Sequence, residues 1–246
     1  MSDDWLLPEW EAPPAVYAVT TTRHGGVSTG LWASMNPASH VGDDPAAVLA
    51  NRACLRTALG LPGEPVWLRQ VHGVRVVEAG RDGVEPEADA AWTGRPGVVC
   101  AVLTADCLPV VFADRGARCV AVAHAGWRGL AAGVLEATVA QLPVPAADLV
   151  TWLGPAIGPA AFEVGAEVRD VFMAQDARAG AAFAPGADGR WYADLYGLAR
   201  QRLAACGVPA VQGGGWCTYS DAARFYSYRR DGTTGRMATL VWLAGP

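Results

Sequence analysis

Three closely spaced apolar segments in the middle of the chain limit the folds that it can adopt. Val98–Thr104, Leu108–Ala113 and Arg118–Ala123 are short and rich in valine and alanine. Segments of this kind are typical of β-strands buried on both faces. Asp114-Arg115-Gly116-Ala117 separates the last two and predicts a hairpin. The chain therefore has to cover both faces of a sheet with other layers.

Helices and further strands are predicted on either side of this region. Asp44 suits the N-cap and Pro45 the first position of a helix that runs to about Leu59. The other predicted helices are Arg128–Leu142, Gly165–Gln175 and Asp194–Cys206, the last closed by Gly207. The other predicted strands are Val16–Thr22, a strand–turn–strand unit over Pro65–Val77 that turns at His72-Gly73, Leu149–Leu153, Ala210–Gln212 and Met237–Leu243. The pattern predicts an α/β protein: a single domain over residues 1–246 with a mixed β-sheet core flanked by helices.

The charged residues exclude several classes of function. The net charge of −5 argues against binding of nucleic acid, which needs a basic face. All 19 basic residues are arginines. Without lysine the chain has no Schiff-base chemistry and no P-loop lysine, so any phosphate has to be bound by guanidinium groups or backbone amides.

The cysteines and the hydropathy indicate a cytoplasmic protein. The six cysteines are scattered, without a Cys-x-x-Cys pair, and are expected to be reduced thiols. The start Met1-Ser2-Asp3-Asp4-Trp5 lacks the features of a signal peptide. The longest apolar stretch, Val98–Ala113, contains Asp106 and Pro109 and is too short to cross a bilayer. We expect no membrane association and a monomer.

Three short segments each hold one metal ligand beside glycine or a small residue. They are Gln70-Val71-His72-Gly73, Thr104-Ala105-Asp106-Cys107 and Ala123-His124-Ala125-Gly126. Two imidazoles and one thiolate form a three-ligand zinc set that leaves a fourth position open for water or substrate. Taken singly, each residue is more often part of a core or a turn than a metal ligand. Together they predict a catalytic metal centre of His72, Cys107 and His124.

Longer motifs surround these ligands and carry a family resemblance. They are residues 21–28, 40–45, 69–73, 104–110, 124–129, 154–158 and 225–231. In this order they resemble the signatures of the YfiH-type family, also called the laccase-domain or polyphenol oxidase family, which includes the peptidoglycan editing factors. The resemblance runs from about residue 18 to about residue 243. It implies a YfiH-like layered fold with Zn²⁺ on His72, Cys107 and His124. It also implies phosphorolysis of purine nucleosides (adenosine, inosine and methylthioadenosine) by inorganic phosphate, with adenosine deamination as a second activity.

Candidate substrate contacts follow from that implied activity. Arg23 and Arg229 are the candidates for binding phosphate or sugar, and His40 is a candidate acid or base near the sugar. Asn36 and Gln70 could hydrogen-bond a base edge or a ribose hydroxyl. Trp127, Phe162 and Tyr226 could stack on the purine, although such aromatic residues are more often part of a core. The arginines could instead be structural, paired with Asp106, Glu163 or Asp231.

Three other functions remain open. A copper-dependent polyphenol oxidase of the laccase type needs many histidines, and the chain has four, although Cu²⁺ can enter a His–His–Cys site by exchange. A cysteine or zinc hydrolase that edits peptidoglycan precursors could use Cys107 as its nucleophile, but a zinc-bound thiolate is a poor one. The third is a metal-binding protein that is not an enzyme and acts on cell-wall synthesis through contacts. Such a protein would not need an open coordination position. The sequence therefore favours the nucleoside enzyme.

Overall fold

The computed structural model describes residues 5–81 and 85–245. Residues 1–4, part of the segment that bears on a signal peptide, lie outside them. The strands are β1 (Val16–Thr20), β2 (Val76–Glu78), β3 (Ala90–Thr93), β4 (Val99–Thr104), β5 (Leu108–Asp114), β6 (Val120–Ala125), β7 (Leu149–Leu153), β8 (Glu163–Val164), β9 (Phe183–Pro185), β10 (Trp191–Ala193), β11 (Ala210–Gly213) and β12 (Met237–Leu243). The helices are α1 (Pro45–Leu59), α2 (Trp127–Ala132), α3 (Val134–Gln141), α4 (Ala166–Met173), α5 (Leu195–Ala205) and α6 (Tyr228–Asp231), with short 3-10 helices at Gly30–Trp32, Ala146–Asp148 and Ala177–Ala182.

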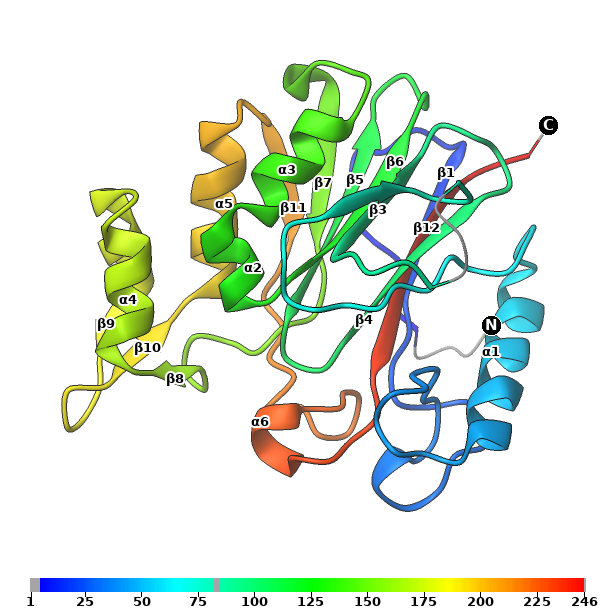
Figure 1. The fold of residues 1–246 in the computed structure, drawn as a ribbon, viewed down its shortest axis with the longest axis horizontal. Helices are drawn as coiled ribbons and strands as arrows, with labels where there is room; N and C mark the ends of the chain where they lie inside the picture. The colour runs from blue at the N-terminus through cyan, green and yellow to red at the C-terminus, as the bar shows by residue number, and fades with distance from the viewer. Residues whose placement is uncertain (1–4, 82–84, 246) are drawn as a thin grey trace.

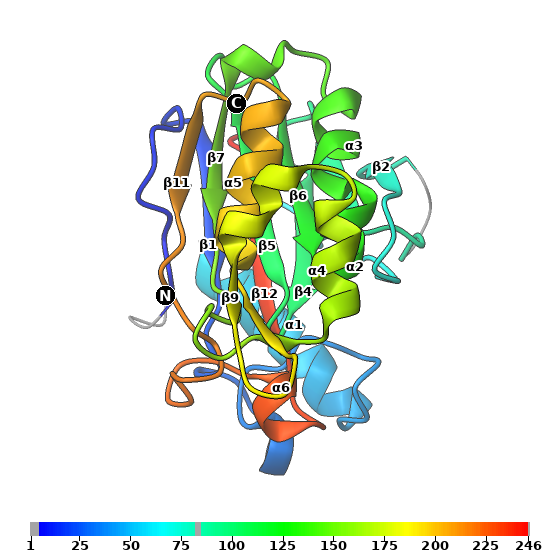
Figure 2. The same ribbon diagram turned by 90° about the vertical axis from the view of Figure 1, so that its left-hand side faces the viewer.

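Two sheets form the centre of the molecule (Figures 1 and 2). The larger sheet has the strand order β11-β7-β5-β6-β3-β2, and the second has the order β1-β12-β4. Pairing in the larger sheet is antiparallel except at its edges, where β11 joins β7 and β2 joins β3 in parallel. The predicted mixed α/β fold is confirmed. A small separate sheet, β8-β10-β9, lies beside α4.

The side chains of β5 show why its sequence is almost uninterruptedly apolar. Val110 and Phe112 pack in one core with residues of α2, α3 and α5, whereas Val111 and Ala113 pack in another with residues of β1, β4 and β12. Successive side chains of a strand point to opposite faces, and here both faces are buried. A third core lies between the second sheet and α1. The layers therefore follow the order α2, α3 and α5, then the larger sheet, then the second sheet β1-β12-β4, and then α1.

The predicted hairpin, the start of α1 and the end of α5 are confirmed. β5 and β6 pair in antiparallel register from Leu108 opposite Ala125 to Ala113 opposite Val120. Asp44 caps α1 by accepting a hydrogen bond from the amide of Ala46, with Pro45 at the first position. Gly207, directly after the last capping residue of α5, has a φ of +79°, which glycine adopts without strain.

Two predicted elements are wrong in detail. Pro65–Val77 is not a strand–turn–strand unit. Its first half makes two isolated β-bridges, Val66 with Cys100 and Arg69 with Glu87, and no continuous ladder. The turn at His72-Gly73 is present, but the following strand begins only at Val76. The predicted helix Arg128–Leu142 is divided into α2 and α3, because Gly133 lies between them with a φ of +101°. β3, β8, β9, β10 and α6 were not predicted.

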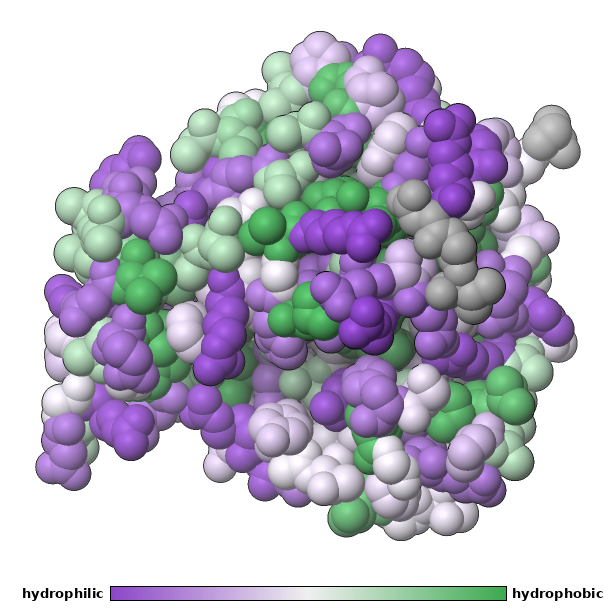
Figure 3. Space-filling model, viewed as in Figure 1, coloured by the Kyte–Doolittle hydropathy of each residue, from purple (hydrophilic) through white to green (hydrophobic). Residues whose placement is uncertain are grey.

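The surface is mixed in polarity. Hydrophilic residues dominate the face shown in Figure 3, and apolar residues form small groups among them. None of the helices in the described part of the chain combines the length and the apolar composition needed to cross a bilayer.

Candidate metal centre and substrate cavity

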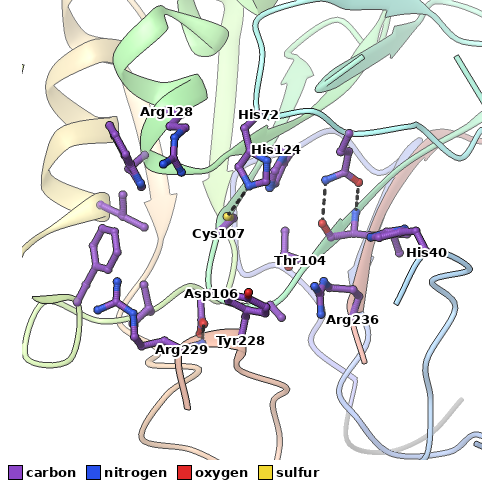
Figure 4. A pocket seen from close by; sticks show the side chains of 17 residues that line it. His40, His72, Thr104, Asp106, Cys107, His124, Arg128, Tyr228, Arg229 and Arg236 are labelled. Carbon is purple, nitrogen blue, oxygen red and sulfur yellow. Dashed lines mark hydrogen bonds between the residues drawn. The ribbon is translucent and has the colours of Figure 1, made fainter. Parts of the chain in front are cut away.

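His72, Cys107 and His124 meet where the two sheets connect. β4 and β5 follow each other in the chain but belong to different sheets, and Cys107 lies in the link between them. His124 is near the end of β6, directly opposite Pro109 of β5. His72 comes from the loop before β2. One donor atom from each residue lies within 4.8 Å of the other two, and Sγ of Cys107 is 3.7 Å from Nε2 of His72 (Figure 4).

Asp89 holds two of these three residues in place. Its Oδ1 lies 2.8 Å from Nδ1 of His124, and its carboxylate also accepts hydrogen bonds from the amides of Val71, His72 and Gly73. The three amide bonds support His72 in a left-handed conformation, with a φ of +61°. Since Nδ1 of His124 is engaged, Nε2 is the nitrogen available to a metal. Hydrogen bonds from His124 and these amides lower the pKa of Asp89 against the opposing effect of its burial.

Asp106 fixes the backbone beside Cys107. Its φ of +88° is unusual for a residue other than glycine, and its carboxylate accepts hydrogen bonds from Oγ1 of Thr218 and from the amide of Arg229, both at 2.6 Å. Its carbonyl oxygen accepts the amide of Ile157 at 2.9 Å. The link between β4 and β5 is thereby tied to α6 and to the segment that follows β7.

The three ligand candidates influence each other's protonation in the absence of metal. Burial opposes ionisation of Cys107, but the charge and hydrogen bonds of His124 and His72 lower its pKa to about 6. Burial likewise disfavours the charged form of His124, but Cys107 and Asp89 raise its pKa to about 9. The metal-free pair is therefore a thiolate beside an imidazolium at neutral pH.

Two glycines allow close packing around the three ligand candidates. A Cβ on Gly126 would lie 2.8 Å from Sγ of Cys107 and 2.9 Å from Cδ2 of His72. A Cβ on Gly129 would lie 2.9 Å from the carbonyl oxygen of Gly73. Both glycines belong to the start of α2, so the absence of side chains lets this helix pack directly against the metal ligands.

The donor set fits a zinc ion. Zinc is bound by thiolate and imidazole at about 2.0–2.3 Å, so two donors of one ion are separated by a distance close to that between Cys107 and His72. A carboxylate on the second nitrogen of a ligating histidine is a common feature of such centres, and Asp89 supplies it. The residues of this centre therefore fit a metal ion, and their number leaves room for a further ligand.

The centre opens into a cavity of about 460 Å³, a size typical of small-molecule sites. One side of the cavity carries Trp127 and Phe162, with the guanidinium groups of Arg128 and Arg229 over their rings. Ile157 and Leu195 add further apolar surface to the lining. The other side is polar. His40, Thr104 and Arg236 lie there, on the opposite side of Cys107 from Arg128 and Arg229 (Figure 4). Gln70 also lines the cavity and bonds Leu103, the residue before Thr104.

The structure brings most of the predicted site residues to this cavity. His72, Cys107, His124, His40, Gln70 and Arg229 all line it. Both polar atoms of the Gln70 amide bond the backbone of Leu103 at 2.8 Å, so Gln70 supports the edge of β4. Arg229 donates to the carbonyl oxygen of Glu163 and lies over Phe162.

Arg23 and Asn36 are not among the residues that line the cavity. The guanidinium of Arg23 donates to the carbonyl oxygens of Ala33 and Ala222 and lies over Tyr226, which is itself fully buried. Asn36 is also fully buried. Its Oδ1 accepts the amide of Arg236 at 3.0 Å, so it acts from behind the cavity wall.

Sequence reasoning missed Asp89, Thr104, Tyr228 and Arg236 as site residues. Asp89 directly precedes the short apolar segment of β3, and an acidic residue at the start of a buried strand could have drawn attention to it. Arg236 directly precedes the last strand. No spacing in the sequence connects it to Thr104, which pairs with Met237, the residue after Arg236.

Fold and site together define a layered α/β protein with a candidate metal centre in a small-molecule cavity. The family model described as multi-copper polyphenol oxidoreductase laccase matches residues 17–244. A Pseudomonas aeruginosa protein named purine nucleoside phosphorylase is 60% identical over 240 residues, covering 97% of this chain and 98% of the relative. The purine nucleoside phosphorylase YfiH of Escherichia coli is 53% identical over 239 residues, with the same coverage.

Solved structures agree with these relatives. The crystal structure of the Neisseria meningitidis protein NMB0706 superposes with a TM-score of 0.95 at 48% identity, covering 99% of this chain and all of the other. YlmD from Geobacillus stearothermophilus superposes with a TM-score of 0.86 at 31% identity. The chain belongs to the laccase-like YfiH family.

Proposed function

We propose that this protein is a zinc-dependent purine nucleoside phosphorylase. The observation that carries the proposal is that His72, Cys107 and His124 line the same cavity as an apolar wall and three arginines. A purine nucleoside has a flat apolar base and a polar sugar, and its co-substrate phosphate is an anion. The names of the Pseudomonas aeruginosa and Escherichia coli relatives support the same activity.

The reaction joins phosphate to the sugar and releases the base. An oxygen of hydrogen phosphate forms a bond to C1′ of the ribose, and the bond from C1′ to the purine nitrogen breaks. The bonding electrons leave with the purine, which takes up the proton that phosphate loses. Such a sugar centre has oxocarbenium character, so groups that hold the two reactants in line and protonate the base speed the reaction.

Residues of the cavity suit these tasks. Phe162, Trp127 and Ile157 offer apolar surface for the base, and Arg128, Arg229 and Arg236 offer positive charge for phosphate. Burial and the charge of Arg236 lower the pKa of His40, so its imidazole is neutral near pH 7 and can accept a proton. Bound zinc supplies a Lewis acid and lowers the pKa of a coordinated water.

The proposal extends to substrates and setting. Adenosine, inosine and methylthioadenosine are the proposed nucleosides. Adenosine deamination is the proposed second activity, because removal of the amino group needs an activated water. We propose a monomeric enzyme in which residues 1–246 form one catalytic domain. The cysteines of the described residues are unpaired, which suits the reducing cytoplasm.

Two alternatives are weaker. A multicopper oxidase needs several metal centres, whereas one group of candidate ligands is present in the described residues. The low pKa of Cys107 favours a cysteine hydrolase that edits peptidoglycan precursors. That role requires a free thiolate, and coordination to a metal would occupy it.

The test is product analysis by mass spectrometry on protein with quantified metals. Zinc-loaded protein is incubated with adenosine or inosine, with and without phosphate, and a copper-loaded sample is assayed for phenol oxidation. We expect phosphate-dependent release of base and formation of ribose 1-phosphate, lost in Cys107→Ala and kept in Cys54→Ala, an exposed cysteine outside the cavity. Rapid phenol oxidation with several coppers per chain and no release of base would overturn the proposal.

A further inference from the structure

The polar side of the cavity contains a buried threonine hydroxyl with no internal partner. Thr104 is 1% exposed and lines the cavity. Among residues 5–81 and 85–245, no group accepts from or donates to its Oγ1. A buried hydroxyl without a hydrogen bond is destabilising, because it has lost its bonds to water without replacing them. The hydroxyl of Thr104 is therefore available to a ligand in the cavity.

The backbone of Arg236 lies near that of Thr104 because β12 pairs with β4, and both side chains line the cavity. Met237 of β12 is the direct partner of Thr104 in β4, and Arg236 is the residue before Met237. The backbone amide of Arg236 donates to Oδ1 of Asn36 at 3.0 Å. The Nη1 group donates to the carbonyl oxygens of Thr234 and Gly235 at 2.8 and 3.0 Å. These bonds hold the guanidinium at the cavity wall.

The charge of Arg236 has no carboxylate in contact with it in the described part of the chain. Its guanidinium bonds are to backbone carbonyls, and it lies over the ring of Tyr228 at 5.9 Å. Arg236 is partly buried, whereas the two arginines on the apolar side are exposed and lie against Trp127 and Phe162. The negative groups that act on Arg236, Cys107 and Asp106, do so without a direct ion pair. A partly buried cation without a direct ion pair is stabilised by an anionic ligand.

Asn36 connects this arginine to His40. Its side-chain nitrogen donates to the carbonyl oxygen of Ala38 at 3.2 Å, and its Oδ1 accepts the amides of Ala38 and Arg236. The buried side-chain amide of Asn36 thus fixes the backbone position of both the loop that carries His40 and the start of β12. In Figure 4, His40, Thr104 and Arg236 lie on the same side of the cavity.

We propose that Arg236, Thr104 and His40 form the phosphate subsite, and that the purine lies on the opposite, apolar side against Phe162. The inference rests on the proposed function in taking the anion to be inorganic phosphate. The guanidinium binds two phosphate oxygens, the threonine hydroxyl donates to one of them, and His40 lies on the same side of the cavity. The two substrates then approach each other across the metal centre, so that the phosphate oxygen reaches C1′ on the face opposite the leaving base.

Thr104→Val and Arg236→Gln test the subsite in the zinc-loaded protein. Valine keeps the volume of threonine and removes the hydroxyl. Thr138→Val is the matched control, because Thr138 is a buried threonine of α3 whose hydroxyl bonds its own helix outside the cavity. Steady-state rates are measured against phosphate and against inosine, and binding of inorganic phosphate without nucleoside is measured by calorimetry. Bound zinc is quantified in each variant.

We expect the KM for phosphate to rise on the order of tenfold in Thr104→Val and further in Arg236→Gln. The KM for inosine and the zinc content should stay close to those of the Thr138→Val control. An unchanged phosphate KM in both variants, or an equal rise for inosine, overturns the subsite while phosphorolysis by the wild type stands.

The failure of the proposed function gives a different result. If the wild type cleaves no nucleoside in the presence of phosphate, calorimetry alone decides on the subsite. Phosphate binding by the wild type that is lost in both variants then supports an anion site at Arg236 and Thr104. No phosphate binding by the wild type overturns the subsite as well.

Discussion

Asp89 and His124 form a buried pair in which Oδ1 of the carboxylate lies 2.8 Å from Nδ1 of the imidazole. The backbone amide of His124 also donates to the carbonyl oxygen of Asp89 at 2.7 Å, so the two residues are joined twice. Because the same carboxylate accepts the amides around His72, it connects two of the three metal ligand candidates. The rigidity of the centre therefore depends on a residue that does not itself face the metal.

Asp89→Asn should weaken metal binding while leaving the fold in place. The asparagine side chain has a single acceptor oxygen, whereas the carboxylate accepts hydrogen bonds from three backbone amides and contacts the imidazole. Loss of such a partner typically costs 10–100-fold in metal affinity. Competition with a chelator of known affinity measures the change, and circular dichroism checks the fold. An affinity equal to that of the wild type would show that Asp89 has no part in holding the ligands.

Gly126→Ala should displace the metal ligands. The new Cβ would lie within 3 Å of both Cys107 and His72, although the backbone of Gly126, with a φ of −64°, accepts alanine without strain. Overpacking of this kind typically destabilises by about 1–3 kcal/mol. Gly245→Ala is the control, since its Cβ meets no atom within 4 Å. The comparison uses bound zinc and denaturant unfolding, and normal zinc content in Gly126→Ala would contradict the geometry.

Alkylation of Cys107 in metal-stripped protein should rise with pH around 6. Burial opposes the thiolate, but His124 and His72 lower the pKa of Cys107 to about 6, and only the thiolate reacts. Cys206 serves as the internal control, because burial raises its pKa and its alkylation should begin at higher pH. Peptide mass spectrometry after iodoacetamide treatment separates the two sites. Zinc should protect Cys107, and equal pH profiles for both cysteines would count against the assigned environment.

Asp114→Asn should destabilise the hairpin of β5 and β6 in a pH-dependent way. The buried carboxylate of Asp114 accepts Nε and Nη2 of Arg118 at 2.7 and 2.8 Å. These bonds lower its pKa, against the opposing effect of burial. A carboxyl with a depressed folded pKa contributes stability above its unfolded pKa of about 3.9, and loses it as the pH falls through the folded value.

We therefore expect a lower urea midpoint for Asp114→Asn than for the wild type at pH 7, and a difference that shrinks below pH 4. Asp176→Asn is a useful comparison, since that carboxylate pairs with Arg178 at the surface. It should change the midpoint much less. A difference for Asp114→Asn that is constant from pH 7 to pH 3 would rule out the charge of Asp114 as its origin.

The buried strands of the centre were predictable from sequence because both of their faces are apolar. β4, β5, β6, β7 and β12 were all predicted within a residue or two. β3 was missed because it is short and follows a polar segment, and its place is set by pairing with β6 and not by its own composition. The break between α2 and α3 at Gly133 was missed because the apolar spacing continues across it.

The candidate ligands were predictable for a different reason. Histidine and cysteine are rare in this chain, so their occurrence beside glycines at the ends of apolar segments is informative. Arginine is abundant, so its occurrence in a motif does not show which arginines bind a ligand. Arg23 has the same kind of flanking residues as a ligand-binding arginine, but its guanidinium is bonded to backbone carbonyls outside the cavity.

The sequence by itself determined the α/β class, the buried strands and the residue types that can bind a metal, because these follow from local apolar patterns and from ligand chemistry. Only the tertiary structure decided which polar groups surround the metal. Asp89 reaches His124 and His72 across the fold. Arg236 and Thr104 line one cavity because β12 pairs with β4, although these strands lie more than a hundred residues apart in the chain. Such contacts depend on strand order and register, which arise when distant segments bury their apolar faces together.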